Sequence, residues 1–179
     1  MPLTIAILIP GLLLVAAGLP LALLHAGFIA ALRSFPRSTA AANVLFGAGS
    51  LGFLYNIWHL SPADFGDYRV ILFIVFATIA AMAFRCVPDF LAVRGVCILV
   101  LLAASPLLAA GYMNYDHPLI YFQKAFVYVC IVFAIWLGAQ PWRMRDFLEW
   151  LLARPERTRA VGGALAAYGL LLTAVAFTY

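Results

Sequence analysis

Six long stretches of apolar side chains, each of roughly twenty to thirty residues, most restrict how this chain can fold. A helix of about 20 apolar residues is long enough to cross the hydrocarbon core of a bilayer. The chain has 179 residues, of which 66% are hydrophobic and only 10% are charged. Because a water-soluble domain carries about 25% charged residues, the surplus apolar surface must be covered by lipid. The sequence therefore predicts a single all-α domain embedded in a membrane.

The predicted domain is a bundle of six transmembrane helices with one further helix at the membrane surface. The predicted spans cover residues 3–32, 39–60, 68–87, 92–113, 119–138 and 159–179. Before the last span, residues 142–153 show the periodicity of an amphipathic helix that lies in the interface. Its apolar face would carry Met144, Phe147, Leu148 and Leu151. Arg145 and Glu149 are spaced to pair on the opposite face.

The arginines predict the orientation of the bundle, because basic residues beside membrane spans stay on the cytoplasmic side. Nine of the eleven Lys and Arg residues fall in the loops after the first, third and fifth spans. These topology anchors are Arg33, Arg37, Arg85, Arg94, Arg143, Arg145, Arg154, Arg157 and Arg159. With those loops inside, we expect a bacterial-type inner membrane protein with both termini on the outer side. The positive charge is then explained by topology, and we expect no nucleic acid partner.

The six predicted spans also group into three successive hairpins. Each hairpin has a proline near its cytoplasmic bend, at Pro36, at Pro88, and at Pro141 with Pro155. A triplicated two-helix unit and simple hairpin geometry both account for this pattern.

Polar side chains inside or beside the spans are the candidate functional residues. They would line a polar path or an outer vestibule and are Asn43, His59, Asp116, His117, Gln123, Lys124 and Tyr128. Ionisable groups inside spans are costly and mark function, although Lys124 could also snorkel to the surface. If Lys124 is functional, its expected partners are Asp116, Asp64 or Asp67. His25, inside the first span, is expected to bond to a neighbouring helix.

His59 and His117 share the predicted outer side of the membrane. Two imidazoles there could hold a haem iron or respond to pH, while a hydrogen bond to water is the simpler role. The three cysteines form no metal-binding spacing, and no nucleophile elbow or paired acidic residues occur inside the spans. We therefore expect a protein that is not an enzyme and that holds no metal or cofactor.

The first predicted bend reads Pro36-Arg37-Ser38-Thr39-Ala40-Ala41-Ala42-Asn43, followed by Gly47 and Ser50. This segment resembles the entry to the second span in the bacterial urea/amide channel family. The resemblance implies six spans in three hairpins, both termini outside, and an oligomeric pore for small neutral amides. That family keeps a glutamate before a glycine in its last span, whereas Tyr168 precedes Gly169 here. The resemblance thus implies a facilitator of altered selectivity.

Two classes of function stay open for this sequence. The first is a channel or transport-like protein for a small solute, which needs a polar path through the bundle. The second is an accessory or structural subunit of a larger membrane complex, whose small-residue faces are buried against a partner. Candidate faces are Ala48 with Gly52, and Gly163 with Ala167. A redox subunit with haem or quinone near His59 and His117 is a third class. The expected partners are the lipid bilayer and either further copies of this chain or other membrane subunits.

Overall fold

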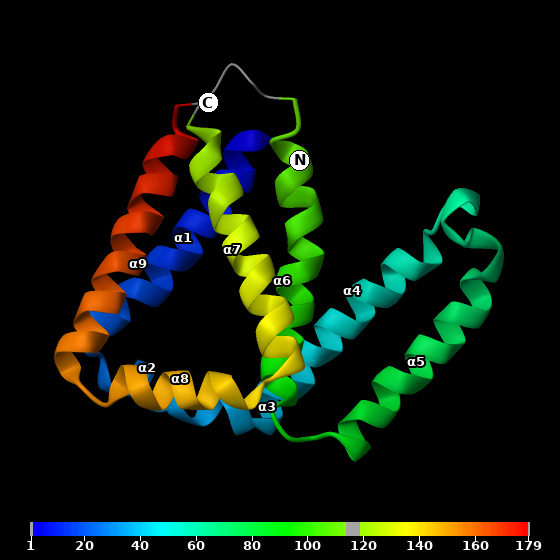
Figure 1. Cartoon of the computed structure of the whole chain (residues 1–179), viewed down its shortest axis with the longest axis horizontal. Helices are drawn as coiled ribbons and strands as arrows, with labels where there is room; N and C mark the ends of the chain where they lie inside the picture. Colours follow the sequence, from blue (N-terminus) through cyan, green and yellow to red (C-terminus); the bar gives the residue numbers. More distant parts are fainter. Residues whose placement is uncertain (1, 114–118, 179) are drawn as a thin grey trace. The chain divides into compact units, whose positions relative to one another are not determined.

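The computed structural model describes residues 2–113 and 119–178, and every regular element in these ranges is helical (Figure 1). Six helical segments in the described ranges are long and apolar enough to cross a membrane. They are Leu3–Ala22, Thr39–Trp58, Gly66–Cys86, Leu91–Ala110, Ile120–Ala139 and Pro155–Ala176. The structure therefore confirms an all-helical chain with six apolar spans, which indicates a multi-pass membrane protein.

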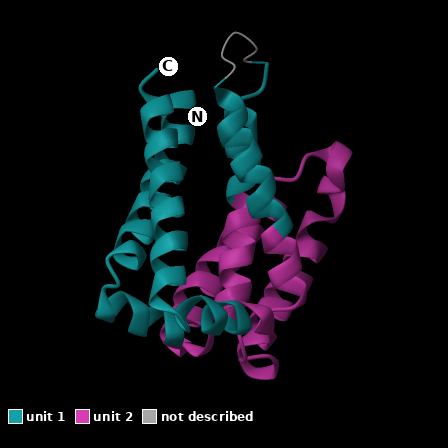
Figure 2. Cartoon of the chain, turned by 60° about the vertical axis from the view of Figure 1, so that its left-hand side comes forward, with its two compact units in different colours: residues 1–33, 103–132, 145–179 teal, residues 34–102, 133–144 magenta. Residues whose placement is uncertain are grey.

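The chain forms two compact units, each built from separate parts of the sequence (Figure 2). Unit 1 comprises Met1–Arg33, Ala103–Val132 and Arg145–Tyr179, and unit 2 comprises Ser34–Leu102 and Phe133–Met144. The boundaries fall inside four helices, namely α2 (Ala26–Ser34), α6 (Leu91–Ala110), α7 (Ile120–Ala139) and α8 (Trp142–Leu152). Each of these helices therefore contributes to both units.

In unit 1, the first and last apolar helices, α1 (Leu3–Ala22) and α9 (Pro155–Ala176), pack against each other in antiparallel directions. At one end of this contact, Ile7 is fully buried in a cluster with Leu172 and Val175. Lipid is as apolar as these side chains, so close packing rather than exclusion of water must hold the two helices together. This contact joins the two ends of the sequence, and the grouping into three successive hairpins stays a prediction.

Glycines on both helices let the backbones of α1 and α9 approach closely. A methyl group placed on Gly18 would lie 2.5 Å from the Ala166 nitrogen, and one on Gly169 would lie 2.7 Å from the Gly11 carbonyl oxygen. A methyl group on Gly162 would likewise run into the backbone of α1. Side chains do not fit at such distances, so the contact requires glycine at these positions.

The first span is shorter than the sequence predicted. We predicted one span over residues 3–32, but α1 ends at Ala22 and a separate helix, α2 (Ala26–Ser34), follows. Leu24 adopts the left-handed backbone conformation with a φ of 52°. The N–H groups of Leu24 and His25 donate back to carbonyls of the last turn, in the pattern of a Schellman motif. Glycine is the usual residue in this conformation, so a leucine at position 24 did not indicate a helix end in the sequence.

His25 lies in this turn, so the prediction that it is inside a span and bonded to a neighbouring helix is wrong. Its side chain is exposed, and Nδ1 accepts a hydrogen bond from the Phe28 N–H at 3.3 Å. The imidazole thereby satisfies one of the free donors in the first turn of α2, as an N-cap residue does.

In unit 2, α4 (Gly47–Trp58) and α5 (Arg69–Cys86) run antiparallel, joined through the short turns η3 (Pro62–Asp64) and η4 (Gly66–Tyr68). Three edge-to-face ring pairs connect α5 to α4 and the residue before it, with centroids 5.1 to 5.6 Å apart: Phe46–Phe84, Phe53–Phe76 and Trp58–Phe73. Such pairs contribute about 0.5–1.5 kcal/mol each beyond the area that they bury. None of the residues of α5 is buried, which fits a helix that is mostly exposed to lipid.

The segment that leads into α4 winds irregularly, through the 3₁₀ turn η1 (Phe35–Arg37), the short α3 (Thr39–Ala41) and the π-helical turn η2 (Ala42–Phe46). Gly95 of α6 lies against this segment, because a methyl group there would come 2.7 Å from the Leu45 carbonyl carbon. A π turn persists only where its surroundings compensate for its poorer geometry. Here the backbone of α6 packs closely against the π turn η2 at Gly95, which is a contact of this kind.

Two adjacent glycines of α9 provide a matched test of the contact between α1 and α9. We expect Gly162→Ala to destabilise the protein by about 1–3 kcal/mol, because the added methyl group overlaps the α1 backbone. Gly163→Ala should be neutral or stabilising by about 0.5–1 kcal/mol, because its methyl group meets open space and alanine favours a helix. Denaturant unfolding of both variants in mixed micelles, followed by circular dichroism, measures the difference. Equal effects of the two substitutions would contradict the described packing.

Candidate functional site

The candidate polar residues are divided between the two units. Unit 2 holds Asn43 and His59, and unit 1 holds Gln123, Lys124 and Tyr128. Asp116 and His117 lie outside the described residues.

Gln123 is fully buried, and its side-chain amide caps the C-terminal end of the neighbouring helix α6 in unit 1. Its Nε2 donates to the carbonyl oxygen of Leu107, in the last turn of α6, at 3.1 Å. The N–H of Gly111 bonds to Leu108 instead, so the glutamine supplies a donor that the helix end needs. Gln123 Oε1 has no hydrogen-bond partner among the described residues. A buried acceptor without a partner costs about 1–3 kcal/mol, so a water molecule or polar ligand would gain most by binding at this atom.

Lys124, the next residue, is half-buried and lies near the start of α7. Its Nζ lies 5.7 Å from the centre of the Tyr121 ring, and its stem passes Gly111. This is the geometry of a lysine whose stem is covered and whose charged head rests beside an aromatic face. In the ranges that the structure describes, no carboxylate pairs with it. Of its expected partners, Asp64 and Asp67 belong to unit 2, and Asp116 is not described.

Tyr168 of α9 binds the same part of α7. Its hydroxyl donates to the Phe122 carbonyl oxygen at 2.8 Å, and its ring lies 6.2 Å from that of Phe126. Tyr128, in contrast, has 59% of its surface exposed, while Gln123 is fully buried. Five residues along a helix turn the side chain by about 140°, so Gln123 and Tyr128 lie on different faces of α7. These two residues do not line one path.

Asn43 and His59 stand at opposite ends of the helical run that includes α4. Asn43 is exposed in the π turn η2. His59 follows the last residue of α4, where its Nδ1 lies 2.8 Å from the Tyr55 carbonyl oxygen and its ring lies 4.2 Å from the Tyr55 ring. Sixteen residues of helix separate the two by about 24 Å. His59 therefore caps the end of α4, well away from Asn43.

The described parts of the units provide no metal site. Across residues 2–113 and 119–178, no three His, Cys, Asp or Glu side chains come close enough to share a metal ion. A polar hollow of about 420 Å³ lies at the turns between α4 and α5 in unit 2, lined by residues that include Asp67 and Arg69. Unit 2 contains a hollow of about 290 Å³ between α4, α5 and α6, lined by apolar side chains such as Phe53 and Phe76, with Ser50 as the one hydroxyl residue of the lining. This hollow can accept an apolar group, such as an acyl chain or a side chain, but not a hydrated solute.

A further polar cluster joins the end of α8 to the start of α9, and we call it the α8–α9 corner (Trp150, Leu151, Arg154, Arg157 and Thr158). Thr158 Oγ1 donates to the Leu151 carbonyl at 2.9 Å, and Arg157 Nη1 donates to the Trp150 carbonyl at 2.9 Å. The Arg157 guanidinium also lies 4.3 Å from the centre of the Trp150 ring. These side chains satisfy the last carbonyls of α8. Sequence reasoning missed this role, because it treated Arg157 only as a signal of orientation.

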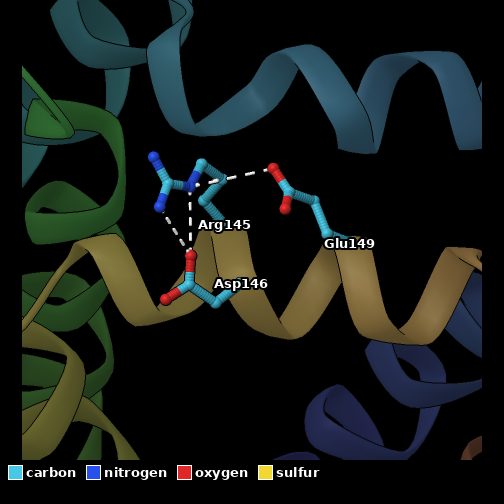
Figure 3. Close-up of polar contacts among 3 residues, drawn as sticks. All are labelled: Arg145, Asp146 and Glu149. Carbon is cyan, nitrogen blue, oxygen red and sulfur yellow. Dashed lines mark hydrogen bonds and ion pairs between the residues drawn. The ribbon is translucent and has the colours of Figure 1, made fainter.

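The exposed side of α8 carries an ion-pair cluster (Figure 3). Arg145 Nη2 lies 2.7 Å from Asp146 Oδ1, and Arg145 Nε lies 3.8 Å from Glu149 Oε1. The predicted contact with Glu149 is therefore present, but the contact with Asp146 is the closer one. The hydrogen bonds that Arg145 donates to Asp146, and then the charge of that carboxylate, raise the pKa of Arg145, which stays protonated. All three groups are exposed, so the pairs add little stability.

The apolar face of α8 differs from the prediction at one residue. Leu148 and Leu151 are buried and Met144 is half-buried, whereas Phe147 has 48% of its surface exposed. The ring of Phe147 stacks on the ring of Trp150 with centroids 6.0 Å apart. Two exposed aromatic rings thus lie next to the buried face, and the position of α8 at a membrane surface stays a prediction.

Comparison of the chain with protein-family models, with curated proteins and with solved structures gives no match. The resemblance of residues 36–50 to the urea/amide channel family therefore stays a prediction. The structure adds that this segment contains the turns η1 and η2 and the start of α4.

The bond between Tyr168 and α7 generates a test with an internal control. We expect Tyr168→Phe to destabilise the protein by about 0.5–1.5 kcal/mol, because it removes the hydroxyl that donates to the Phe122 carbonyl. Tyr128→Phe should leave stability unchanged, because Tyr128 is exposed on the same helix. Unfolding of both variants in mixed micelles gives the comparison. A silent Tyr168→Phe variant would show that the bond contributes nothing.

Proposed function

We propose that this chain is a non-enzymatic, multi-pass membrane protein that acts as an accessory or structural subunit of a larger membrane assembly. The observation that carries this proposal is that one exposed face of α9 carries small residues. Gly162 and Ala166 are buried towards α1, while their neighbours Gly163 and Ala167 are exposed, and a methyl group on Gly163 would meet open space. Exposed small residues at this spacing allow another helix to pack closely in lipid.

The distribution of polar side chains supports the same class of function over a channel. A pore for a hydrated solute needs polar groups along one continuous line. In unit 1, Gln123 is buried and Tyr128 is exposed on another face of α7, and in unit 2, Asn43 and His59 are at opposite ends of one helical run. Neither unit supplies such a line from these residues.

A pore for small neutral amides is the second candidate, and one atom favours it. Gln123 Oε1 is buried without a partner among the described residues, and a carboxamide oxygen is a suitable acceptor for the N–H groups of an amide. The resemblance of residues 36–50 to the urea/amide channel family points the same way.

The proposal includes an orientation in a bacterial-type inner membrane. The loops that contain Arg33 and Arg37, Arg85 and Arg94, and the arginines of residues 143–159 lie in the cytoplasm, which puts both termini on the outer side. In this orientation α8 lies along the cytoplasmic surface of the membrane, with its buried leucines towards the protein. The predominance of arginine in these loops supports the arrangement.

The subunit proposal predicts that bulk on the exposed face of α9 breaks an assembly. We expect the wild-type protein, extracted in mild detergent, to migrate as a complex of defined mass. Gly163→Leu combined with Ala167→Leu should weaken association by about 1–3 kcal/mol, because the larger side chains prevent close approach. Ala125→Leu, which enlarges an exposed residue of α7, is the control and should leave the complex intact. Native gels and light scattering measure the masses.

A wild-type monomer without associated subunits would contradict the subunit proposal. Urea or acetamide flux into proteoliposomes, abolished by Gln123→Leu and retained in Tyr128→Phe, would instead establish the pore.

The proposed orientation can be tested with a native cysteine. Cys86 is exposed at the end of α5, whereas Cys97 is buried and Cys130 is half-buried within helices. A membrane-impermeant maleimide should therefore label Cys86 only after intact cells are permeabilised. Ala63→Cys, in the exposed loop after α4 and in a Cys86→Ser background, should be labelled in intact cells. Labelling of Cys86 from outside would reverse the orientation.

A further inference from the structure

The α8–α9 corner holds one arginine in a fixed position with donors to spare. Arg157 is kept in place by the bond from Nη1 to the Trp150 carbonyl and by contact with the Trp150 ring. A guanidinium has five N–H donors, so this bond leaves most of them for another acceptor. Fixing the side chain in advance removes much of the entropy that binding would otherwise cost.

The surroundings of Arg157 leave its positive charge uncompensated. Arg154 is three residues away and exposed, at the start of α9. In the described part of the chain, the recorded ion pairs are those of Arg145 with Asp146 and Glu149, so neither Arg154 nor Arg157 has a carboxylate partner. Glu156 is exposed and lies within ion-pair distance of neither arginine. The corner is therefore complementary to an anion.

An exposed aromatic surface adjoins this positive charge. Phe147 and Trp150 stack on each other, and 48% and 51% of their surfaces are exposed. From Phe147 to the corner, the surface is thus apolar at Phe147, amphipathic at Trp150 and cationic at Arg157. A phospholipid has the same order, from acyl chain through glycerol to phosphate. A free anion has no apolar part that could contact the two rings.

We propose that the α8–α9 corner is a binding site for the headgroup of an anionic phospholipid. Arg157 and Arg154 bind the phosphate, and Trp150 and Phe147 cover the glycerol and the upper part of an acyl chain. Charge-assisted, bidentate contacts from a guanidinium suit a phosphate in particular. The inference goes beyond the proposed subunit function and rests only on the proposed position of α8 at the membrane surface.

Trp150 is both part of the site and its reporter. In a full-length variant with Trp58→Phe, Trp136→Phe and Trp142→Phe, Trp150 is the remaining tryptophan. The probe is phosphatidylglycerol brominated on one acyl chain near the glycerol, in vesicles of phosphatidylcholine, compared with phosphatidylcholine brominated in the same way. We expect phosphatidylglycerol to associate with the site about fivefold or more strongly, as judged from quenching, because one arginine near the surface is worth about that factor.

Three substitutions decide where the preference arises. Arg154→Gln and Arg157→Gln should each lower the preference by about fivefold. Among the residues that the structure describes, the Arg154 side chain has no hydrogen-bond partner, so its variant separates lipid binding from stability of the corner. Arg159→Gln removes the same charge from α9 at an exposed position without contact with Trp150, and it should leave the preference unchanged.

The outcomes separate this inference from the proposed membrane position. Strong but equal quenching by the two lipids would overturn the lipid site while leaving α8 at the membrane, and no quenching by either would overturn both. Equal loss in Arg154→Gln and Arg159→Gln would show diffuse surface charge and overturn the site. Millimolar inorganic phosphate should not change the quenching, and displacement by it would identify a site for free phosphate instead.

Discussion

The structure depends most on the close approach of α1 and α9. In a bilayer no hydrophobic effect drives two helices together, so stability comes from contacts between atoms at short range. Gly18 and Gly169 allow these contacts by bringing one backbone against the other. Because α1 and α9 are the first and last helices of the described sequence, their contact within unit 1 can form only after α9 is present.

A second constraint is that polar backbone groups need partners where no water reaches. Four polar side chains of unit 1 are used in this way. Gln123 bonds the end of α6, Thr158 and Arg157 bond the end of α8, and Tyr168 bonds a carbonyl of α7. Each replaces a donor that a helix end lacks or adds one from a neighbouring helix. The same need explains why candidate functional residues turned out to hold the fold together.

The sequence correctly predicted six helical spans, because length and apolar composition determine which segments can cross a bilayer. It missed the end of α1, where Leu24 takes a conformation that leucine seldom adopts, and the π turn before α4. It also could not decide which glycines are buried. Gly162 and Gly163 are neighbours with the same propensities, and only the direction of α1 makes one essential and leaves the other exposed.

The candidate site shows a similar limit, since residue type indicated polarity but not direction. Gln123 and Tyr128 looked equivalent along the sequence, yet the rotation of the helix puts one inside and the other outside. The arginines of residues 143–159 were read as one signal of orientation, but the structure gives them different surroundings. Arg145 is neutralised by two carboxylates, whereas Arg157 is fixed against Trp150 and has no carboxylate partner among the described residues. Topology requires only that these residues be basic, so it cannot account for this difference. An unpaired guanidinium held beside exposed aromatic rings suits an anionic lipid, and the physical distinction between the two arginines is what makes that role specific.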